Sequence, residues 1–268
     1  MKSKIFEKSL TKDFNKELWS VFLKAVKDYR LITEGDKIAV CISGGKDSML
    51  LALCMKIWQK YSPYKFDVEY ICVNSGYSAE NLRKIKENAD LFDTDIKVFK
   101  AEIFESVRNS NKNPCFVCSR LRRGFLYKKA MENGCNKIAL GHHFDDAVET
   151  TLMGMLYGSQ IQAMLPRIKS DNYADMELIR PLWLVREENI IKFCNENSLS
   201  FTKCECSVTD GSGRISKREE IRNLLEYMRK TNPEVDKRIF KSCQNVNLKH
   251  LVSYYRGEEN HSFLDEFN

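Results

Sequence analysis

A glycine turn between a strand and a helix constrains this 268-residue chain more than any other feature. The run Lys37–Ile42 is apolar after its first residue, as expected for a strand buried on both faces of a parallel sheet. A helical pattern extends from Asp47 to Tyr61. The turn between them contains two glycines, which let backbone N–H groups approach an anion, and the helix N-terminus adds positive potential. The sequence therefore predicts a phosphate-binding loop after the first strand.

The spacing of this loop separates it from two other phosphate-binding motifs. A Walker loop needs four residues between its first glycine and a Gly-Lys-Ser/Thr ending, and the dinucleotide fingerprint is G-x-G-x-x-G. The turn fits neither pattern, but all six of its positions match the PP-loop of N-type ATP pyrophosphatases. That resemblance implies that the loop holds the pyrophosphate released when a substrate oxygen attacks the α-phosphorus of ATP. The residues expected to bind ATP here are Ser43, Gly44, Gly45, Lys46, Asp47 and Ser48.

Strand and helix patterns alternate through the next part of the chain. After the first strand, further strands are expected at 66–73, 96–99, 137–140 and 179–182, with helices between them. This alternation predicts an α/β fold with a doubly wound parallel sheet of about five strands. Strand patterns stop after Ser200, and 219–230 and 232–250 read as helices. The expected divisions are an N-terminal helical segment (1–32), a PP-loop ATP pyrophosphatase domain (33–200) and a helical C-terminal segment (201–268).

A second loop, residues 141–146, joins the expected strand 137–140 to another helix. Ligands of open α/β sheets bind at the carboxyl ends of the strands, so this loop is expected beside the phosphate loop. Its carboxylates, with Asp47, are candidate ligands or neighbours of the Mg²⁺ that accompanies ATP. Carboxylates at a helix N-terminus can also simply cap the helix. The residues of this loop expected to bind ATP are Gly141, His142, Asp145 and Asp146.

Four of the ten cysteines have a spacing that needs an explanation. Cys115 and Cys118 form a C-x-x-C pair before a basic helix, and Cys204 and Cys206 lie in a distant segment. A C-x-x-C pair fits a zinc half-site, a redox dithiol or an iron–sulfur site. Three thiolates from two segments would suit a 4Fe–4S cluster with one iron open to a non-protein sulfur, and two accidental pairs are the alternative. The other cysteines are interpreted as structural: Cys41, Cys54, Cys72, Cys135, Cys194 and Cys243.

Basic residues gather in the helix that follows the C-x-x-C pair. The net charge of +6 permits a nucleic-acid partner without requiring one. A solvated helix face would have the same composition. No segment approaches the roughly 20 apolar residues of a membrane span, so a cytoplasmic protein without membrane contact is expected. The residues expected to contact a nucleic-acid partner are Arg120, Arg122, Arg123 and Lys128.

The chain resembles the tRNA 2-thiocytidine synthetase family from about Glu17 to Leu251. The matching stretches are 115–127, 138–146, 157–158, 179–182, 186–187 and 244–246. The resemblance implies that ATP, with Mg²⁺ on Asp47, adenylates the 2-oxygen of a cytidine in the tRNA anticodon loop, at position 32. Sulfur carried on a 4Fe–4S cluster then replaces that oxygen, giving 2-thiocytidine, AMP and pyrophosphate. The residues to which it gives catalytic roles are Lys46, Asp47, Cys115 and Cys118.

The chain departs from the family pattern at two places. Where the family usually has C-x-x-C for the third cluster ligand, this chain has Cys204-Glu205-Cys206. The related uridine thiolases show Glu-Cys followed by spaced arginines, as this chain does, so Cys206 is assigned as the third ligand and Cys204 is the alternative. The turn 74–77 after the second strand lacks the aspartate that the family usually places there.

The resemblance also implies partners. These are tRNA, a sulfur donor such as a cysteine desulfurase or free sulfide, and a second copy of the chain in a homodimer. Three alternatives stay open. The enzyme could thiolate another tRNA base such as uridine, or it could be a tRNA lysidine synthetase, which has no use for a C-x-x-C pair. The non-enzyme alternative is an ATP-binding iron–sulfur sensor without turnover.

Overall fold

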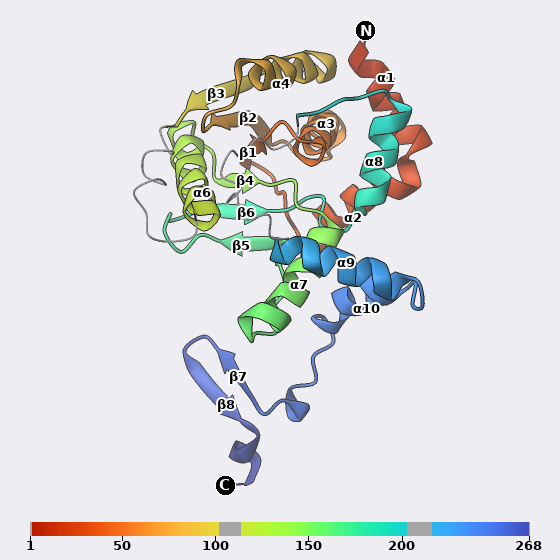
Figure 1. The fold of residues 1–268 in the computed structure, drawn as a ribbon. Helices are drawn as coiled ribbons and strands as arrows, with labels where there is room; N and C mark the ends of the chain where they lie inside the picture. The colour runs from red at the N-terminus through yellow and green to blue at the C-terminus, as the bar shows by residue number, and fades with distance from the viewer. Residues whose placement is uncertain (1, 102–113, 203–215, 268) are drawn as a thin grey trace. The chain divides into compact units, whose positions relative to one another are not determined.

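The computed structural model describes residues 2–101, 114–202 and 216–267 (Figure 1). The chain divides into two compact units, which are described separately here. The first contains Met1–Ala147 and Leu165–Arg214, and the second contains Val148–Met164 and Ile215–Asn268. Among the described residues, no helix combines the length and the apolar character that a membrane crossing requires.

A six-stranded sheet forms the centre of the first unit, with the strand order β3-β2-β1-β4-β6-β5. All neighbouring strands are parallel except β5, which pairs antiparallel with β6 at one edge. The predicted α/β fold with a mainly parallel sheet is confirmed, with one strand more than expected. The strands are β1 (Lys37–Ile42), β2 (Asp67–Asn74), β3 (Ile96–Lys100), β4 (Lys137–Ala139), β5 (Arg167–Lys169) and β6 (Glu177–Ile179).

Alternate residues of β1 enter two different cores, because successive side chains of a strand point to opposite faces of the sheet. Ile38 and Val40 join a large core together with α3 (Lys46–Tyr61), the N-terminal helices and α8 (Glu187–Glu196). Ala39 and Cys41 join a smaller core with residues of α6 (Pro114–Glu132). Helices therefore cover both faces of the sheet, as a doubly wound fold requires.

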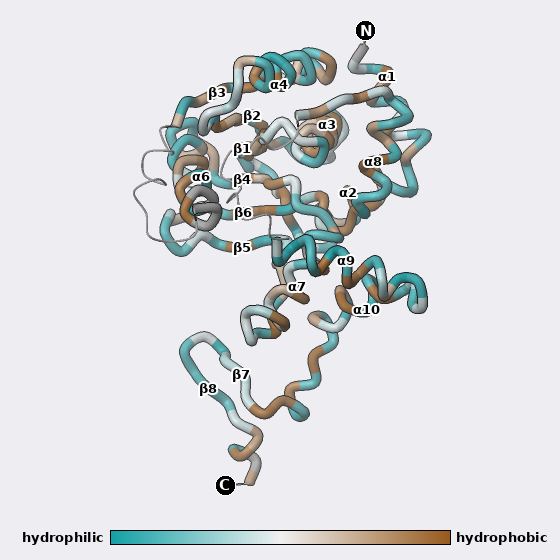
Figure 2. Tube along the Cα trace, in the orientation of Figure 1, coloured by the Kyte–Doolittle hydropathy of each residue, from teal (hydrophilic) through white to brown (hydrophobic). Residues whose placement is uncertain are grey.

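The remaining described helices of the first unit are α4 (Ala79–Phe92) and those of the N-terminal region. α4 is capped by Ser78, whose hydroxyl accepts a hydrogen bond from the Asn81 N–H. In Figure 2, α4 is largely hydrophilic, whereas the central strands include hydrophobic stretches. The N-terminal region contains α1 (Lys2–Lys8), π-helical turns at Ser9–Asp13 and Asn15–Trp19, and α2 (Ser20–Asp28).

The second unit holds the end of α7 (Phe144–Gly158) and the C-terminal elements. The first helix expected there is present as α9 (Lys217–Arg229), whereas the second, expected over 232–250, is shorter and forms α10 (Val235–Ser242). A hairpin of β7 (Ser253–Arg256) and β8 (Glu259–Ser262) lies between 3₁₀ turns at Leu248–His250 and Phe263–Phe267. The sequence analysis expected no strand after Ser200, and the hairpin was missed because its strands are short and carry no apolar run.

Candidate functional site

The glycine turn connects β1 to α3 as predicted, and Gly44 is the position where only glycine fits. Its φ is +84°, in the left-handed region, and a Cβ atom there would lie 2.5 Å from Thr202 Oγ1 and 2.6 Å from Ile85 Cγ1. Thr202 also donates its backbone N–H to the Gly44 carbonyl at 3.2 Å. Thr202 is thus anchored on the phosphate loop.

The two serines of the loop hold its shape from inside. The Ser48 hydroxyl accepts the Ser43 backbone N–H at 3.1 Å and donates to the Gly45 carbonyl at 3.0 Å. The Ser43 hydroxyl donates to Ser48 Oγ at 3.1 Å. Gly45 is extended and precedes the first turn of α3, so unpaired N–H groups of that turn remain available to an anion. The loop is therefore ordered before a phosphate binds.

The second predicted loop lies against the first. A Cβ atom on Gly141 would be 3.0 Å from both the Asp47 carbonyl carbon and the Ser48 nitrogen. Gly141 therefore allows two backbone segments to approach more closely than a side chain would permit. The structure brings together the two motifs that the sequence placed at the carboxyl ends of neighbouring strands.

Lys46 lies between two carboxylates at the start of α3. Its Nζ is 2.7 Å from Glu187 Oε1 and 3.1 Å from Asp47 Oδ1. Burial disfavours the charged amine, but these carboxylates outweigh burial and raise the pKa of Lys46. Burial also raises the pKa of Asp47, against the opposing effects of Lys46 and His143. Glu187 was not among the predicted site residues, because the pair joins positions 141 apart in the chain.

Asp146 and His143 cap α7 reciprocally. The Asp146 carboxylate accepts the His143 backbone N–H at 3.1 Å, and His143 Nδ1 accepts the Asp146 backbone N–H at 3.4 Å. The Nε2 atom of His143 lies 3.5 Å from Asp146 Oδ2 and 3.9 Å from Asp47 Oδ1. The capping alternative that the sequence left open for Asp146 is thus seen, and the same cap orients His143 toward the phosphate loop.

Asp145 fixes the start of α8 instead. Its carboxylate accepts the Glu187 backbone N–H at 2.7 Å and pairs with Arg186 at 3.2 Å. Asp145 therefore positions the helix whose first residue pairs with Lys46. Glu149, one helical turn later, belongs to the second unit, where its buried carboxylate lies 2.7 Å from Arg222 and 3.0 Å from Arg218.

A cavity of about 370 Å³ opens at the phosphate loop. Six of the ten residues predicted to bind ATP line it, including His142 and Asp146, whereas Gly44, Gly45, Lys46 and Asp145 do not. Two arginines of α6 that the sequence assigned to tRNA also line it, Arg122 and Arg123. The other two basic candidates on α6, Arg120 and Lys128, are exposed. The lining residues are Cys41, Ile42, Ser43, Asp47, Ser48, Val73, Arg122, Arg123, Leu126, Leu140, Gly141, His142 and Asp146.

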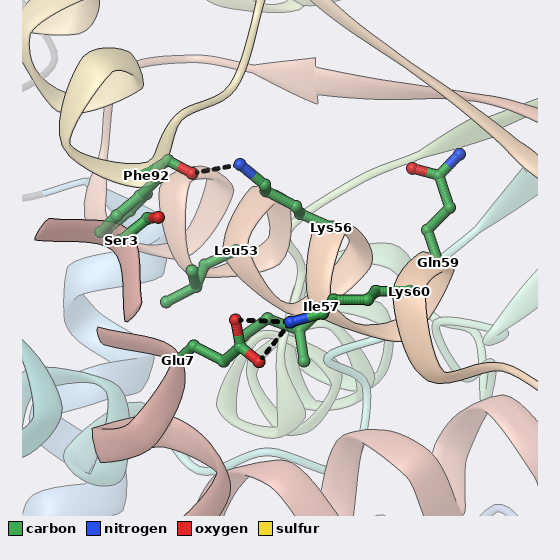
Figure 3. A pocket seen from close by; sticks show the side chains of 8 residues that line it. All are labelled: Ser3, Glu7, Leu53, Lys56, Ile57, Gln59, Lys60 and Phe92. Carbon is green, nitrogen blue, oxygen red and sulfur yellow. Dashed lines mark hydrogen bonds and ion pairs between the residues drawn. The ribbon is translucent and has the colours of Figure 1, made fainter. Parts of the chain in front are cut away.

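A second cavity, of about 360 Å³, lies between α1 and α3 near the end of α4 (Figure 3). Its two lysines already have partners: Lys60 pairs with Glu7 at 3.0 Å, and Lys56 donates to the Phe92 carbonyl at 3.0 Å. The first bond attaches α1 to α3, and the second attaches the end of α4 to α3. The cavity is therefore better explained as a groove of the helix packing than as a binding site.

Within the described residues, Asp47 is the candidate ligand for a metal ion. No group of three or more His, Cys, Asp or Glu side chains within them could hold a metal ion. Asp47 Oδ1 is buried and makes no hydrogen bond in the described structure, although the amine of Lys46 is close. Mg²⁺ is commonly held by one or two carboxylates together with substrate phosphates, and Asp47 suits that mode.

Cys115 and Cys118 lie in the first turns of α6, three residues apart, so their Cα atoms share a helix face. The sequence had suggested that the helix begins after the pair. In the structure it begins before the pair, at Pro114. Cys204 and Cys206 lie outside the described residues. Five of the other cysteines are buried, and burial raises the pKa of Cys41 to about 12 and of Cys72 and Cys135 to about 11. Protonated, enclosed thiols are poor metal ligands.

Comparisons with known proteins agree with this geometry. The profile of a PP-loop domain family matches residues 10–226. A Geobacter metallireducens protein named tRNA-cytidine(32) 2-sulfurtransferase is 37% identical over 233 residues, covering 85% of this chain and 89% of the relative. A Coxiella burnetii protein of the same name is 33% identical over 246 residues, covering 91% and 94%. The U34-tRNA thiolase NcsA from Methanococcus maripaludis, solved with its 4Fe–4S cluster, has a TM-score of 0.69 at 20% identity, covering 87% of this chain and 78% of that one. The last likeness shows a shared fold.

Proposed function

The chain belongs to the PP-loop family of tRNA-cytidine(32) 2-sulfurtransferases, and from that premise we propose that it replaces the 2-oxygen of cytidine 32 in tRNA with sulfur at the expense of ATP. The observation that carries the proposal is the single cavity in which the phosphate loop, the 141–146 loop and the C-x-x-C helix meet. A bare phosphate site would not need a helix whose first turns contain a C-x-x-C pair.

Adenylation is the first step of the proposed reaction. The cytidine 2-oxygen forms a bond to the α-phosphorus of ATP, and the bond from that phosphorus to the β-phosphate oxygen breaks, releasing pyrophosphate. The N–H groups of the loop and the amine of Lys46 would stabilise the charge that develops on pyrophosphate. Lys46 is free to turn toward phosphate once anionic oxygens compete with Glu187 for it. Mg²⁺, held by Asp47 and the ATP phosphates, would add Lewis-acid stabilisation when bound.

Substitution is the second step. Sulfide forms a bond to C2 of the activated base, and the bond from C2 to oxygen breaks, so that AMP leaves with the former base oxygen. A 4Fe–4S cluster held by Cys115, Cys118 and Cys206 would supply a soft sulfur nucleophile shielded from water. The position of the cysteine pair at the start of α6, whose later residues line the cavity, supports this assignment. The sulfur would come from a cysteine desulfurase or from free sulfide.

The exposed basic side chains of α6 are proposed to bind the tRNA backbone. Arg120 and Lys128 are exposed on the helix that carries the cysteine pair. Phosphate contacts there would hold the anticodon loop while the target base, unstacked more easily than in a duplex, enters the cavity. Arg122 and Arg123 would act at the cavity wall, which both of them line. We further propose a homodimer that works in the cytoplasm, where its tRNA substrate is found.

Nucleoside mass spectrometry of tRNA from the native organism, with and without this gene, tests the proposal. We expect selective loss of 2-thiocytidine, restored by the wild-type gene but not by a Lys46→Ala copy. Loss of a thiouridine would move the target to uridine, and loss of lysidine would identify a lysidine synthetase. An unchanged nucleoside profile would refute the tRNA assignment and favour an ATP-binding sensor.

A further inference from the structure

The turn after β2 points a tyrosine at the phosphate loop. The Asn74 side-chain oxygen accepts the backbone N–H groups of Gly76 at 2.9 Å and Tyr77 at 2.7 Å. Gly76 has a φ of +113°, so the chain reverses sharply there. These bonds hold the backbone of Tyr77 in one place. This is the turn where the sequence lacks the aspartate usual in the family, so its side chains need their own explanation.

The Tyr77 hydroxyl joins two parts of the site. It donates to the Ser43 carbonyl at 3.3 Å and accepts from Arg122 Nη2 at 3.0 Å. A phenol offers one donor and can accept at the same time, and both capacities are used here. One hydroxyl thus connects the first residue of the phosphate loop to a side chain of α6.

Arg122 lies at the nucleotide cavity and on the helix that contains the C-x-x-C pair. It lines the cavity with Ser43, Asp47 and Ser48. It also follows Cys118 by four residues, which places both on the same helix face about one turn apart. A guanidinium carries five N–H donors, so the bond to Tyr77 leaves others for an anion in the cavity.

We infer that Tyr77 is a positioning residue that holds the Arg122 guanidinium against the phosphates of bound ATP. A long arginine side chain loses considerable rotamer entropy when it is fixed. Because the bond to Tyr77 already restricts Arg122 before ATP binds, less of that entropy is lost on binding. The inference rests on the proposed function, because it takes the anion in the cavity to be ATP. It assigns to Arg122 a role at the nucleotide in place of the tRNA contact expected from sequence.

Calorimetric measurement of ATP binding to the cluster-loaded protein tests this inference without tRNA. We expect Arg122→Gln to weaken binding about 10- to 100-fold, since it removes a charged donor. Tyr77→Phe should weaken binding less, about 3- to 10-fold, because the guanidinium remains and loses only the hydrogen bond that positions it. Tyr61→Phe is the matched control. It loses a hydroxyl bonded at 2.6 Å to Glu7, outside the cavity, and should bind ATP as the wild type does.

The double variant separates positioning of Arg122 from a general effect on the loop. If Tyr77 acts through Arg122, adding Tyr77→Phe to Arg122→Gln should change the affinity by less than about twofold. Wild-type affinity in Tyr77→Phe, or full additivity of the two losses, would overturn the inference. Tight ATP binding by the wild type without tRNA-dependent pyrophosphate release would instead refute the proposed function and leave the Tyr77 result standing.

Discussion

Gly44 shows how much of the site depends on the absence of a single atom. The conformation at φ +84° disfavours any side chain, and the Cβ position is occupied by Thr202 and Ile85. Both constraints act on the loop whose N–H groups we propose to bind phosphate. A substitution there should therefore damage stability and ATP binding together.

Gly44→Ala is expected to cost more than Gly35→Ala, which is the matched control. Gly35 has nearly the same φ, +79°, but no atom lies within 4 Å of its Cβ position. The control should lose about 1–2 kcal/mol of unfolding free energy from backbone strain alone. Gly44→Ala should lose more and bind ATP at least about 10-fold more weakly, because the loop must move. Urea denaturation and calorimetry measure the two effects, and equal losses for both variants would contradict the steric argument.

Asp36 and Lys137 form a buried ion pair at the opposite end of β1 and β4. Their side chains are 5% and 3% exposed, with 2.7 Å between Asp36 Oδ2 and Lys137 Nζ. Burial alone would raise the pKa of Asp36, but Lys137, Asn136 and Thr33 outweigh it and lower that pKa. The pair's contribution to stability is therefore complete above the unfolded pKa of about 3.9. It is lost as the pH falls below that value through the folded pKa.

Asp36→Asn should destabilise the protein by about 1–3 kcal/mol at pH 7, because it removes the carboxylate nearest to a buried lysine, which keeps Glu177 at 3.4 Å and the Leu31 carbonyl at 3.1 Å. The difference from the wild type should shrink as the pH is lowered below about 4, because the unfolded wild type then protonates Asp36, and the folded wild type protonates it at a still lower pH. Urea denaturation at neutral and acidic pH measures both. A difference that stays constant between pH 7 and pH 3 would show that the carboxylate charge does not stabilise this end of β1 and β4.

At the level of elements, α6 is proposed to join the cluster to the nucleotide cavity. Cys115→Ala should abolish the brown chromophore of the reconstituted protein, since a three-thiolate site loses one ligand. ATP binding should persist, because the phosphate loop is built from β1 and α3. Cys54→Ala, which removes a fully buried thiol of α3, is the control and should keep the chromophore. Absorption spectra and iron content measure the amount of bound cluster. A complete chromophore in Cys115→Ala would contradict the assignment of Cys115 as a cluster ligand.

The elements that could be predicted are those specified by local sequence. β1, the glycine turn and α3 follow one another directly, so their pattern and their contacts are read from the same residues. β5 was missed because Arg167–Lys169 is three residues long, largely polar, and a strand only through its pairing with β6. Glu187 and Tyr77 were missed for a related reason. Their partners, Lys46 and Ser43, lie 141 and 34 positions away, and only the fold brings them together.

At the scale of the whole molecule, the boundaries expected at residues 32 and 200 stay predictions. The N-terminal helices supply Leu10 and Phe22 to the core that also contains β1 and α3. A truncation at residue 32 would expose that core, so the N-terminal segment is expected to be needed for folding of the first unit. Sequence periodicity reveals that these helices are amphipathic but not which core they join.

Binding of tRNA is the property of the whole molecule that the exposed face of α6 should control. Replacing Arg120 and Lys128 together with glutamine should weaken binding to all tRNAs alike, because phosphate contacts carry no sequence information. If each side chain neutralises one phosphate, the slope of log Kobs against log salt should fall by about 1.4 to 1.8. Lys24 and Lys27, exposed on α2, give a control variant with the same change in net charge. Filter binding of tRNA between low and moderate salt measures both slopes. An α6 variant with the same slope as the α2 control would show that the basic face of α6 is a solvated helix surface and that the tRNA backbone lies elsewhere.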